Sequence, residues 1–504
     1  MQNHGGNTES RSDDTGGGFR SSFRWDVIRC TPRYAYLVAG VAAIGGMLFG
    51  YDIGVISGAE NLLKAKWHLS AGSEELAVSA VLIGAILGGV FAGKLADTIS
   101  RRYALMTLAI VYAIGAVATA LAPSLVVFIV FRIVVGVAVG ASSMIVPTYI
   151  AELAPRQIRG GLVILQQLAI SGGIFISYVL DYIFFTAGWG WRPMFAAAVI
   201  PGIALGVGML YMTHTPRWLA MQGRWDEAEQ VMGRVNPDSK DGEMELLHED
   251  LEDTERGSLR QLLSPGVRGA LIAGLGLAAL QQFVGPNTVL FYGPTIFGYA
   301  GISAGSGGLI AEIMVGAVLF VCVLPTIALV DVVGRKKLFY FGLTGMGSML
   351  VLLGLAFHFG ASGWGLGVLA ILLVYIGCYS LSISPLFWLM TAELYPNRLR
   401  GLGASTATVA NWSANLLISV TFLSAVNTLG KDVVFWIYAA FAAVGIVFVR
   451  FCVPETKGRS LEDIDAYWTN GHRWPEHGDP SRDGDRSESG TRTRPLAHSG
   501  HRAT

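Results

Sequence analysis

The chain is too apolar and too poor in charge to be a large soluble enzyme. It has 504 residues, of which 52% are hydrophobic and 14% charged, with a mean hydropathy of +0.51, whereas soluble domains carry about 25% charged residues. This composition excludes a chain that is disordered throughout. With 36 basic and 36 acidic residues, the chain also lacks the excess positive charge that is typical of a nucleic-acid-binding protein. A membrane protein is predicted.

Charge-free stretches predict twelve membrane-spanning helices, since a helix needs about 20 mostly apolar residues to cross a bilayer. In chain order the eleven stretches are 34–51, 76–93, 103–131, 133–151, 160–180, 193–215, 269–311, 313–330, 338–392, 401–430 and 433–449. The stretch 338–392 is long enough for two spans with a break near 358–365, and 103–151 holds two spans with a break at 122–124. The fold class is therefore all-α.

The polar remainder divides the chain into five parts. Residues 1–33 form a tail without a signal-peptide core, 34–215 a six-helix bundle, 216–268 a charged amphipathic linker, 269–453 a second six-helix bundle, and 454–504 a polar C-terminal segment and tail. We expect both tails to be disordered and both termini to be cytoplasmic, because Lys and Arg gather in the short loops on that side. These loops hold Lys94, Arg101, Arg102, Arg156, Arg159, Arg335, Lys336, Lys337, Arg398 and Arg400, against Lys64, Lys66, Arg192 and Lys431 on the other side.

Two charged motifs occur once in each half of the chain. Asp97, Arg101 and Arg102 recur as Asp331, Arg335 and Lys336 at an offset of 234, and Glu152 and Arg159 recur as Glu393 and Arg400 at an offset of 241. Two halves in the same orientation, with a site between them, are typical of transporters. We interpret these acids and arginines as a latch that pairs between the halves when the inner gate is shut. The alternative is positive-inside topology with helix capping.

A series of short motifs follows in a fixed order along residues 35–465. They are Phe49–Gly58, Gly93–Asp97 with Arg101-Arg102, Arg132–Gly136, Tyr149–Gly160, Gln166–Leu168, Pro216–Leu219, Gln281–Asn287 with Tyr292, Val330–Lys336, Asn411-Trp412 and Pro454–Gly458. This ordered set resembles the sugar porter family of the major facilitator superfamily. The resemblance implies the major facilitator fold, a small sugar as substrate, the lipid bilayer of the plasma membrane as surroundings, and function as a monomer. It implies no enzyme activity, no metal or cofactor and no nucleic acid.

The resemblance also implies a central sugar pocket. Its residues are Phe49, Gln167, Gln281, Gln282, Asn287, Tyr292, Trp388, Asn411 and Trp412. The residue types suit this ligand, because Gln and Asn donate and accept hydrogen bonds without a charge and Trp offers a flat apolar face to a sugar ring. The alternatives are interhelical hydrogen bonding for the amides and packing or interfacial anchoring for the tryptophans.

Only a few ionisable residues lie inside the predicted spans, and Asp52 in the first span and Arg132 in the fourth are the two that stand out. A charge at the bilayer centre costs at least about 2.5–3.5 kcal/mol, so such residues normally pair, and we expect Asp52 to pair with Arg132. In the family that the chain resembles, an aspartate at this place accompanies proton-coupled members. We therefore expect proton symport of a monosaccharide, a hexose first. A static ion pair, a facilitative uniporter, a pentose or inositol symporter and a non-transporting sugar sensor remain alternatives.

The chain departs from the family pattern at a few places. His214 stands where the family has an acid, whereas the C-terminal counterpart, Glu455, is kept and joins the latch residues. Ser100 replaces a glycine that the second half keeps as Gly334. Ile174 and Leu319 occupy places where some members have amides, so we expect a different hydroxyl preference or looser selectivity.

Overall fold

The computed structural model describes most of the chain and, within the described part, only helices and the loops between them. The described residues are 33–154, 159–237, 240–252, 259–302, 305–360, 363–396, 399–457, 459, 461–469, 471 and 473–474. The two terminal tails expected from the sequence fall almost entirely outside these ranges. Twelve helical segments are long and apolar enough to cross a membrane, which confirms the predicted all-α membrane fold.

Each half of the molecule contributes six of these spans. The first half contains α2 (Arg33–Trp67), α3 (Ala71–Ile99), α4 (Arg101–Ala120), α5 (Leu125–Leu153), α6 (Arg159–Thr186), α7 (Trp191–Ala197) and α8 (Val199–Leu210). The second contains α13 (Arg268–Phe283), α14 (Pro286–Phe291), α15 (Gly293–Tyr299), α16 (Ser306–Val333), α17 (Arg335–His358), α18 (Gly365–Leu381), α19 (Ile383–Glu393), α20 (Arg400–Leu429) and α21 (Lys431–Cys452). The breaks predicted near 122–124 and 358–365 are confirmed, since α4 gives way to α5 and α17 to α18 at these places.

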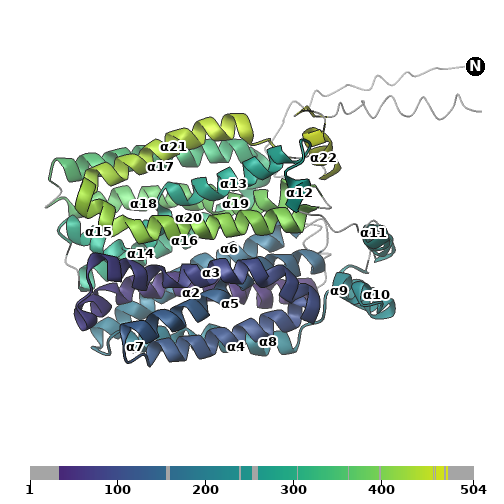
Figure 1. Ribbon diagram of the computed structural model, residues 1–504, viewed down its shortest axis with the longest axis horizontal. Helices are drawn as coiled ribbons and strands as arrows, with labels where there is room; N and C mark the ends of the chain where they lie inside the picture. The colour runs from purple at the N-terminus through teal and green to yellow at the C-terminus, as the bar shows by residue number, and fades with distance from the viewer. Residues whose placement is uncertain are drawn as a thin grey trace, which may run out of the picture.

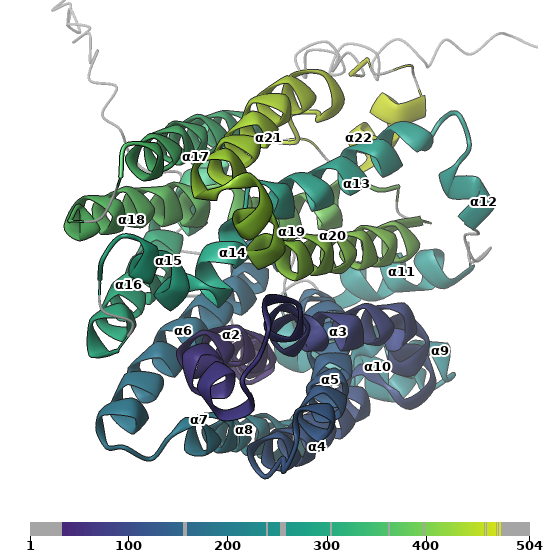
Figure 2. The ribbon, with the colours of Figure 1, turned by 60° about the vertical axis from the view of Figure 1, so that its left-hand side comes forward.

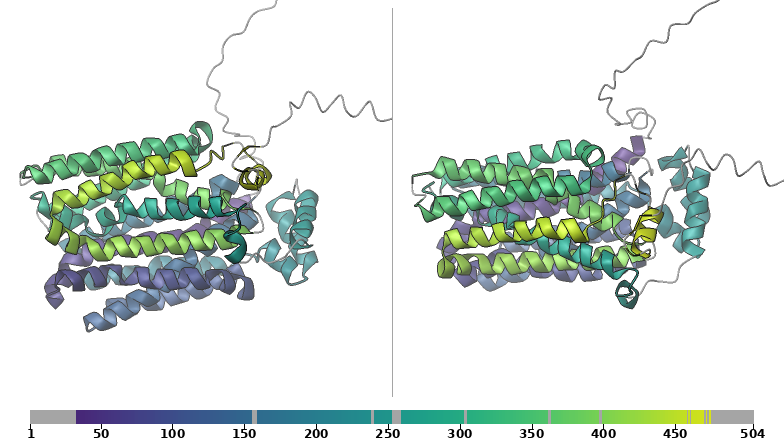
Figure 3. Two further views of the ribbon diagram at one scale, coloured as in Figure 1. Left: turned by 45° about the horizontal axis from the view of Figure 1, so that its top comes forward. Right: turned by 90° about the horizontal axis from the view of Figure 1, so that it is seen from above.

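The two halves lie side by side with their helices nearly parallel (Figures 1 and 2). Between them in sequence come α9 (Pro216–Met221), α10 (Trp225–Val235), α11 (Lys240–Glu252) and α12 (Leu259–Leu262), and α22 (Leu461–Thr469) follows the last span. Figure 3 shows α10 and α11 beyond one end of the bundle, and α22 near the same end. We call this the linker end. Because each half has an even number of spans, α2 and α13 both begin at the linker end.

Two spans of the second half are broken near their middle, and both breaks have a local cause. Between α13 and α14, Gly285 adopts φ 82° and Pro286 starts the next helix, a combination that glycine permits and that interrupts the backbone hydrogen bonds at proline. A Cβ on Gly285 would lie 2.5 Å from the Tyr438 ring, so only glycine fits there. Between α18 and α19, Ser382 departs from helical geometry just before Ser384 and Pro385. Broken helices in membrane proteins are tolerated where they line a cavity.

Candidate functional site

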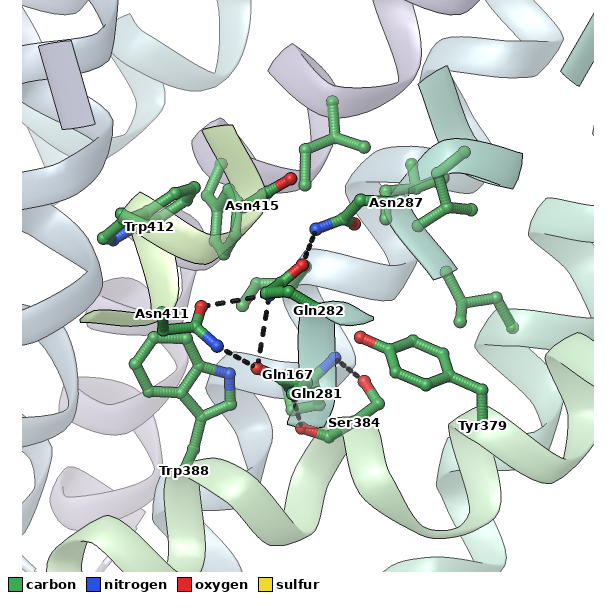
Figure 4. Close-up of a pocket in the computed structure, with 16 residues that line it drawn as sticks. Gln167, Gln281, Gln282, Asn287, Tyr379, Ser384, Trp388, Asn411, Trp412 and Asn415 are labelled. Atoms are coloured by element: carbon green, nitrogen blue, oxygen red, sulfur yellow. Dashed lines mark hydrogen bonds between the residues drawn. The ribbon is translucent and has the colours of Figure 1, made fainter. Parts of the chain in front are cut away.

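A cavity lies between the halves at the level of these two breaks. It has about 440 Å³ of empty space, counting the part that opens to solvent. It is lined by Phe49, Ile53, Gln167, Ile170, Ile174, Gln281, Gln282, Asn287, Leu290, Leu319, Tyr379, Ser384, Trp388, Asn411, Trp412 and Asn415 (Figure 4). The lining contains amides, hydroxyls, aromatic rings and aliphatic side chains, and no charged residue. Such a surface suits a neutral polyhydroxylated ligand.

Four side-chain amides form a connected network on one wall of the cavity (Figure 4). Asn287 Nδ2 donates to Gln282 Oε1 at 2.7 Å, and Gln282 Nε2 donates to Asn411 Oδ1 at 3.1 Å. Asn411 Nδ2 donates in turn to Gln281 Oε1 at 2.6 Å. The break after α13 places the two glutamines before it and Asn287 after it on the same wall. These amides are therefore held in fixed orientations facing the cavity.

The first half reaches this network through Gln167 on α6. Its Nε2 donates to Ser384 Oγ at 2.9 Å, and Gln281 Nε2 donates to the Ser384 backbone oxygen at 3.3 Å. Ser384 belongs to α19, directly after the second break. The hydrogen bond between α6 and α19 thus joins the two halves through residues of the cavity wall.

Aromatic and aliphatic side chains complete the lining. The Phe49 and Trp412 rings lie 4.9 Å apart between centroids, and the buried Trp412 Nε1 has no hydrogen-bond partner, so this donor is available to a ligand. Ile174 and Leu319, where some members of the family have amides, both line the cavity. The aliphatic side chains of Ile174 and Leu319 cannot form hydrogen bonds with a ligand hydroxyl, so this part of the cavity wall is apolar.

Of the nine binding residues expected from the sequence, eight line the cavity and Tyr292 does not. Tyr292 is fully buried, its hydroxyl donates to the Ser419 backbone oxygen at 2.9 Å, and its ring packs 5.3 Å from Phe422. Tyr292 follows the motif Gln281–Asn287 in the sequence, but its side chain packs within the second half and does not reach the cavity. Tyr379, Ser384 and Asn415 also line the cavity, although the sequence analysis did not select them. The only sequence feature that points to these residues is Pro385 directly after Ser384, since a proline marks a helix break within the long stretch 338–392.

Asp52 and Arg132 form a buried ion pair inside the first half. Arg132 Nη1 contacts Asp52 Oδ1, and the side chains are 1% and 5% exposed respectively. Arg132 Nε and Nη2 have no partner, and the guanidinium carbon lies 5.5 Å from the centroid of the Phe195 ring. Asp52 lies on α2 between Phe49 and Ile53, which both line the cavity. One turn of helix therefore connects the ion pair with the cavity wall.

The described ion pairs of the repeated charges at the linker end lie within each half. Arg101 Nη2 lies 2.9 Å from Asp97 Oδ1 and 3.2 Å from Glu152 Oε1, and Arg335 Nη2 lies 2.9 Å from Glu393 Oε1. These pairs are not the pairs between the halves that a latch requires, so the latch stays a prediction. The reason for these pairings is local, because each arginine starts a helix beside the acidic end of a span of its own half.

The remaining predicted latch residues have other environments or lie outside the described side chains. Arg102 donates to the Met209 and Leu210 backbone oxygens at the end of α8, at 3.0 and 2.7 Å. Glu455 accepts hydrogen bonds from the backbone nitrogens of Arg335 and Lys336, both at 3.0 Å. Arg400 lies at the start of α20. The side chains of Arg159 and Asp331 lie outside the described part of the structure.

His214 contacts the start of α4 in the first half, at the place where Glu455 contacts the start of α17 in the second, but through a side chain and not through the backbone. Glu455 caps the start of α17 beside Gly334, and His214 Nδ1 lies 2.7 Å from Oγ of Ser100, the residue before α4. Ser100 and Gly334 have φ values of 79° and 93°, a region that favours glycine. The hydrogen bond with His214 compensates part of the backbone strain at Ser100.

We expect His214 to make the protein less stable in acid. Burial first, and then the guanidinium groups of Arg102 and Arg224, lower the pKa of His214 below its ordinary value of 6.5. The unfolded state thus binds more protons, so this stabilisation is present above pH 6.5 and is lost as the pH falls below it. The melting temperature in detergent at pH 8 and pH 5 tests this. His214→Gln should show a smaller decrease than the natural protein, and an equal decrease contradicts the assignment.

Twelve spans in two like halves, with an uncharged polar cavity between them, define the architecture of a secondary transporter. Residues 38–468 match the family described as Sugar (and other) transporter. The chain belongs to this family, the sugar porters of the major facilitator superfamily, whose members are transporters and not enzymes.

Relatives with described roles cover nearly the whole chain. The putative metabolite transport protein YwtG of Bacillus subtilis is 41% identical over 84% of this chain and 93% of its own length. The galactose-proton symporter of Escherichia coli is 34% identical over 89% of this chain and 98% of its own. A solved structure of the proton:xylose symporter XylE bound to 6-bromo-6-deoxy-D-glucose has a TM-score of 0.77 and 32% identity, covering 86% of this chain and 99% of that one.

Proposed function

We propose that this protein imports a monosaccharide together with protons by alternating access, acting as a monomer in the plasma membrane. The linker end, and with it both termini, faces the cytoplasm. Two observations together carry the proposal. The cavity is uncharged and lined by amides, and Asp52, which pairs with Arg132, lies on the same helix as two residues of the cavity wall, Phe49 and Ile53. The proton-coupled relatives of similar length support it. No cofactor beyond the coupling proton is required.

The coupling acts through α2. Protonation of Asp52 removes the negative charge that holds Arg132, so α2 and α5 gain freedom to move relative to each other. Phe49 and Ile53 then shift with α2 and change the cavity wall. Release of the proton toward the cytoplasm restores the ion pair. One proton moving through 100 mV supplies about 2.3 kcal/mol, enough for roughly fifty-fold accumulation.

The charged groups at the linker end serve as the latch of the inner gate. In the present arrangement the pairs of Arg101 and Arg335 lie within their own halves. When the linker end closes, the acidic ends of α5 and α19 approach the basic starts of helices in the opposite half, and the pairs exchange partners.

A hexose is the first candidate substrate, and a pentose is the second. Both a galactose symporter and a xylose symporter resemble the chain over most of its length. To test the function, purified protein in liposomes is supplied with labelled hexoses, pentoses and inositol, with and without an inward proton gradient. Gradient-dependent accumulation of a monosaccharide supports the proposal. Uptake that merely equilibrates, or the absence of uptake for every compound, contradicts proton symport.

The apolar part of the cavity wall should set the hydroxyl preference. Leu319 is 2% exposed and lines the cavity. We expect Leu319→Asn to favour sugars with a hydroxyl at that side and to disfavour sugars without one, because an unpaired buried amide costs about 1–3 kcal/mol. That corresponds to a change of about 5- to 150-fold in the ratio of two sugar affinities. Competition binding against two sugars measures it, and an unchanged ratio contradicts the role of Leu319.

A further inference from the structure

A second group of acidic side chains is buried beyond Asp52 along α2, toward the end opposite the linker. Glu60, Glu74, Glu75, Asp181 and Glu312 are each at most 2% exposed. They belong to the end of α2, the start of α3, the end of α6 and the start of α16, so they come from both halves. Helix α15, at the left-hand end in Figure 1, contacts Glu60 of this group through Thr295. At the bilayer level such carboxyl groups are functional candidates.

These acids join the two halves. Thr295 Oγ1 on α15 donates to Glu60 Oε1 at 3.1 Å, and the Ser57 hydroxyl on α2 donates to Glu312 Oε1 on α16. Near the linker end, a described side-chain contact between the halves runs from Ser405 Oγ to Met144 Sδ at 3.2 Å. The acids therefore take part in closing the end away from the linker.

Two of the acids have partners that suit an ionised carboxylate. Glu75 accepts hydrogen bonds from both the backbone nitrogen and the hydroxyl of Ser424, each at 2.7 Å. Lys64 Nζ lies 2.7 Å from Glu74 Oε2. Both groups can carry their charge in the closed arrangement.

The other three acids have no cation beside them. Glu60 Oε2 is buried without a hydrogen-bond partner, and the donor to its other oxygen is the neutral Thr295 hydroxyl. A carboxyl group in such surroundings is favoured in its protonated form. Both Asp181 oxygens and Glu312 Oε2 are buried without a partner, and a Cβ on Gly58 would lie 2.5 Å from Asp181 Oδ2. No space for a cation exists on that side of Asp181.

Among the described residues, no ion pair joins a cation to these three acids. The titratable groups around them are Lys64, Glu74, Glu75, Tyr51, Tyr178, Tyr292, Tyr299 and Lys431. Lys64 is paired with Glu74, and Lys431 lies over the Tyr299 ring at 4.2 Å. Asp181 and Glu312 lie against consecutive residues of α2, Gly58 and Ser57. Three like charges cannot be held together in a low-dielectric interior, and the described residues contain no group of acids arranged to bind a metal ion.

We propose that Glu60, Asp181 and Glu312 form a second proton-binding site, filled when the halves close at the end away from the linker and emptied when that end opens. Closing buries the three carboxyl groups and takes protons from the external solution. Opening admits water, the acids ionise, and their repulsion holds the halves apart. The site is separate from the Asp52–Arg132 pair, which lies within one half. It rests on the proposed alternating access but needs no sugar for its test.

The experiment measures closure directly as a function of pH. Lys66→Cys and Leu429→Cys place spin labels on exposed residues of the two halves at that end, with the four native cysteines replaced by alanine. Double electron–electron resonance in nanodiscs gives the closed-to-open ratio between pH 5 and 8. For each proton taken up on closing, this ratio should rise about tenfold per pH unit of acidification. The rise should persist in Asp52→Asn, which removes the other proton site.

Glu312→Gln mimics the protonated acid. It should raise the closed fraction at pH 8. It should also make the closed-to-open ratio less dependent on pH, by up to about tenfold per pH unit, because one proton fewer is bound on closing. The matched control, Glu75→Gln, removes a buried carboxylate that already has two donors, so it should weaken closure without changing the slope. Asp181→Asn serves as a second variant, and melting temperatures verify folding. A pH-independent ratio in the Asp52→Asn background, or an unchanged slope in folded Glu312→Gln and Asp181→Asn, overturns the proposal. Failure of sugar uptake alone would leave this result intact.

Discussion

Asp52→Asn is expected to abolish accumulation of sugar while leaving exchange of sugar across the membrane. With one proton per sugar, a gradient of one pH unit drives about tenfold accumulation in the natural protein. The variant keeps the shape of Asp52 and can still accept a hydrogen bond from Arg132, but it has no titratable carboxyl. Its internal sugar concentration should therefore only equal the external one. Uptake of labelled sugar into liposomes with an imposed pH gradient gives this ratio.

Counterflow provides the control for Asp52→Asn. In liposomes loaded with unlabelled sugar, exchange needs no net proton movement, so the variant should exchange at a rate close to that of the natural protein. Loss of both activities would indicate a structural role for the buried pair of Asp52 and Arg132. Accumulation equal to that of the natural protein would show that the proton is carried elsewhere.

Gln282→Ala is expected to weaken sugar binding more than any other single amide substitution. Gln282 connects Asn287 and Asn411, so its removal leaves an amide donor and an amide oxygen without their partners in the cavity wall. Each unpaired group costs about 1–3 kcal/mol, which corresponds to at least about a fivefold loss of affinity. Calorimetric titration of the purified protein with the transported sugar measures this loss.

Gln166→Ala is the matched control for Gln282→Ala. Gln166 is a buried glutamine next to Gln167, but its Nε2 donates to the Ser143 backbone oxygen at 3.2 Å within the first half and it does not line the cavity. This variant should change stability and leave sugar affinity within about twofold, less than the loss of one net hydrogen bond. Equal losses of affinity in the two variants would show that the amides act only through helix packing.

The sequence predicts the membrane topology well because the physical requirement is strong. A bilayer demands long apolar helices, so charge-free stretches locate the spans, and the breaks predicted at 122–124 and near 358–365 appear where the structure has loops. The cavity residues Gln281, Gln282 and Asn287 are also predictable, since three amides within seven residues of an apolar span need a common explanation. Tyr292 follows them in sequence but packs away from the cavity, because the turn after α14 rotates it toward α20.

The same reliance on charge-free stretches hides the second group of acids. Asp181 directly follows the stretch 160–180, Glu312 separates the stretches 269–311 and 313–330, and Glu60 lies nine residues after the stretch 34–51. An acid beyond a charge-free stretch normally faces water. Their burial depends on the contact between the two halves, as for Ser57 with Glu312, and such contacts have no local sequence signal. The partners of Arg101 and Arg335 escape prediction for the same reason, because sequence spacing does not tell which neighbouring helix an arginine reaches.

The measurement that tests the account most directly is proton movement driven by sugar. Liposomes containing the purified protein and a pH-sensitive dye, without any imposed gradient, receive the transported sugar from outside. Proton symport predicts acidification of the interior that begins with sugar entry, is absent for sugars that do not enter, and is lost in Asp52→Asn. Entry of the sugar without any change of internal pH in the natural protein would contradict proton coupling and identify a uniporter.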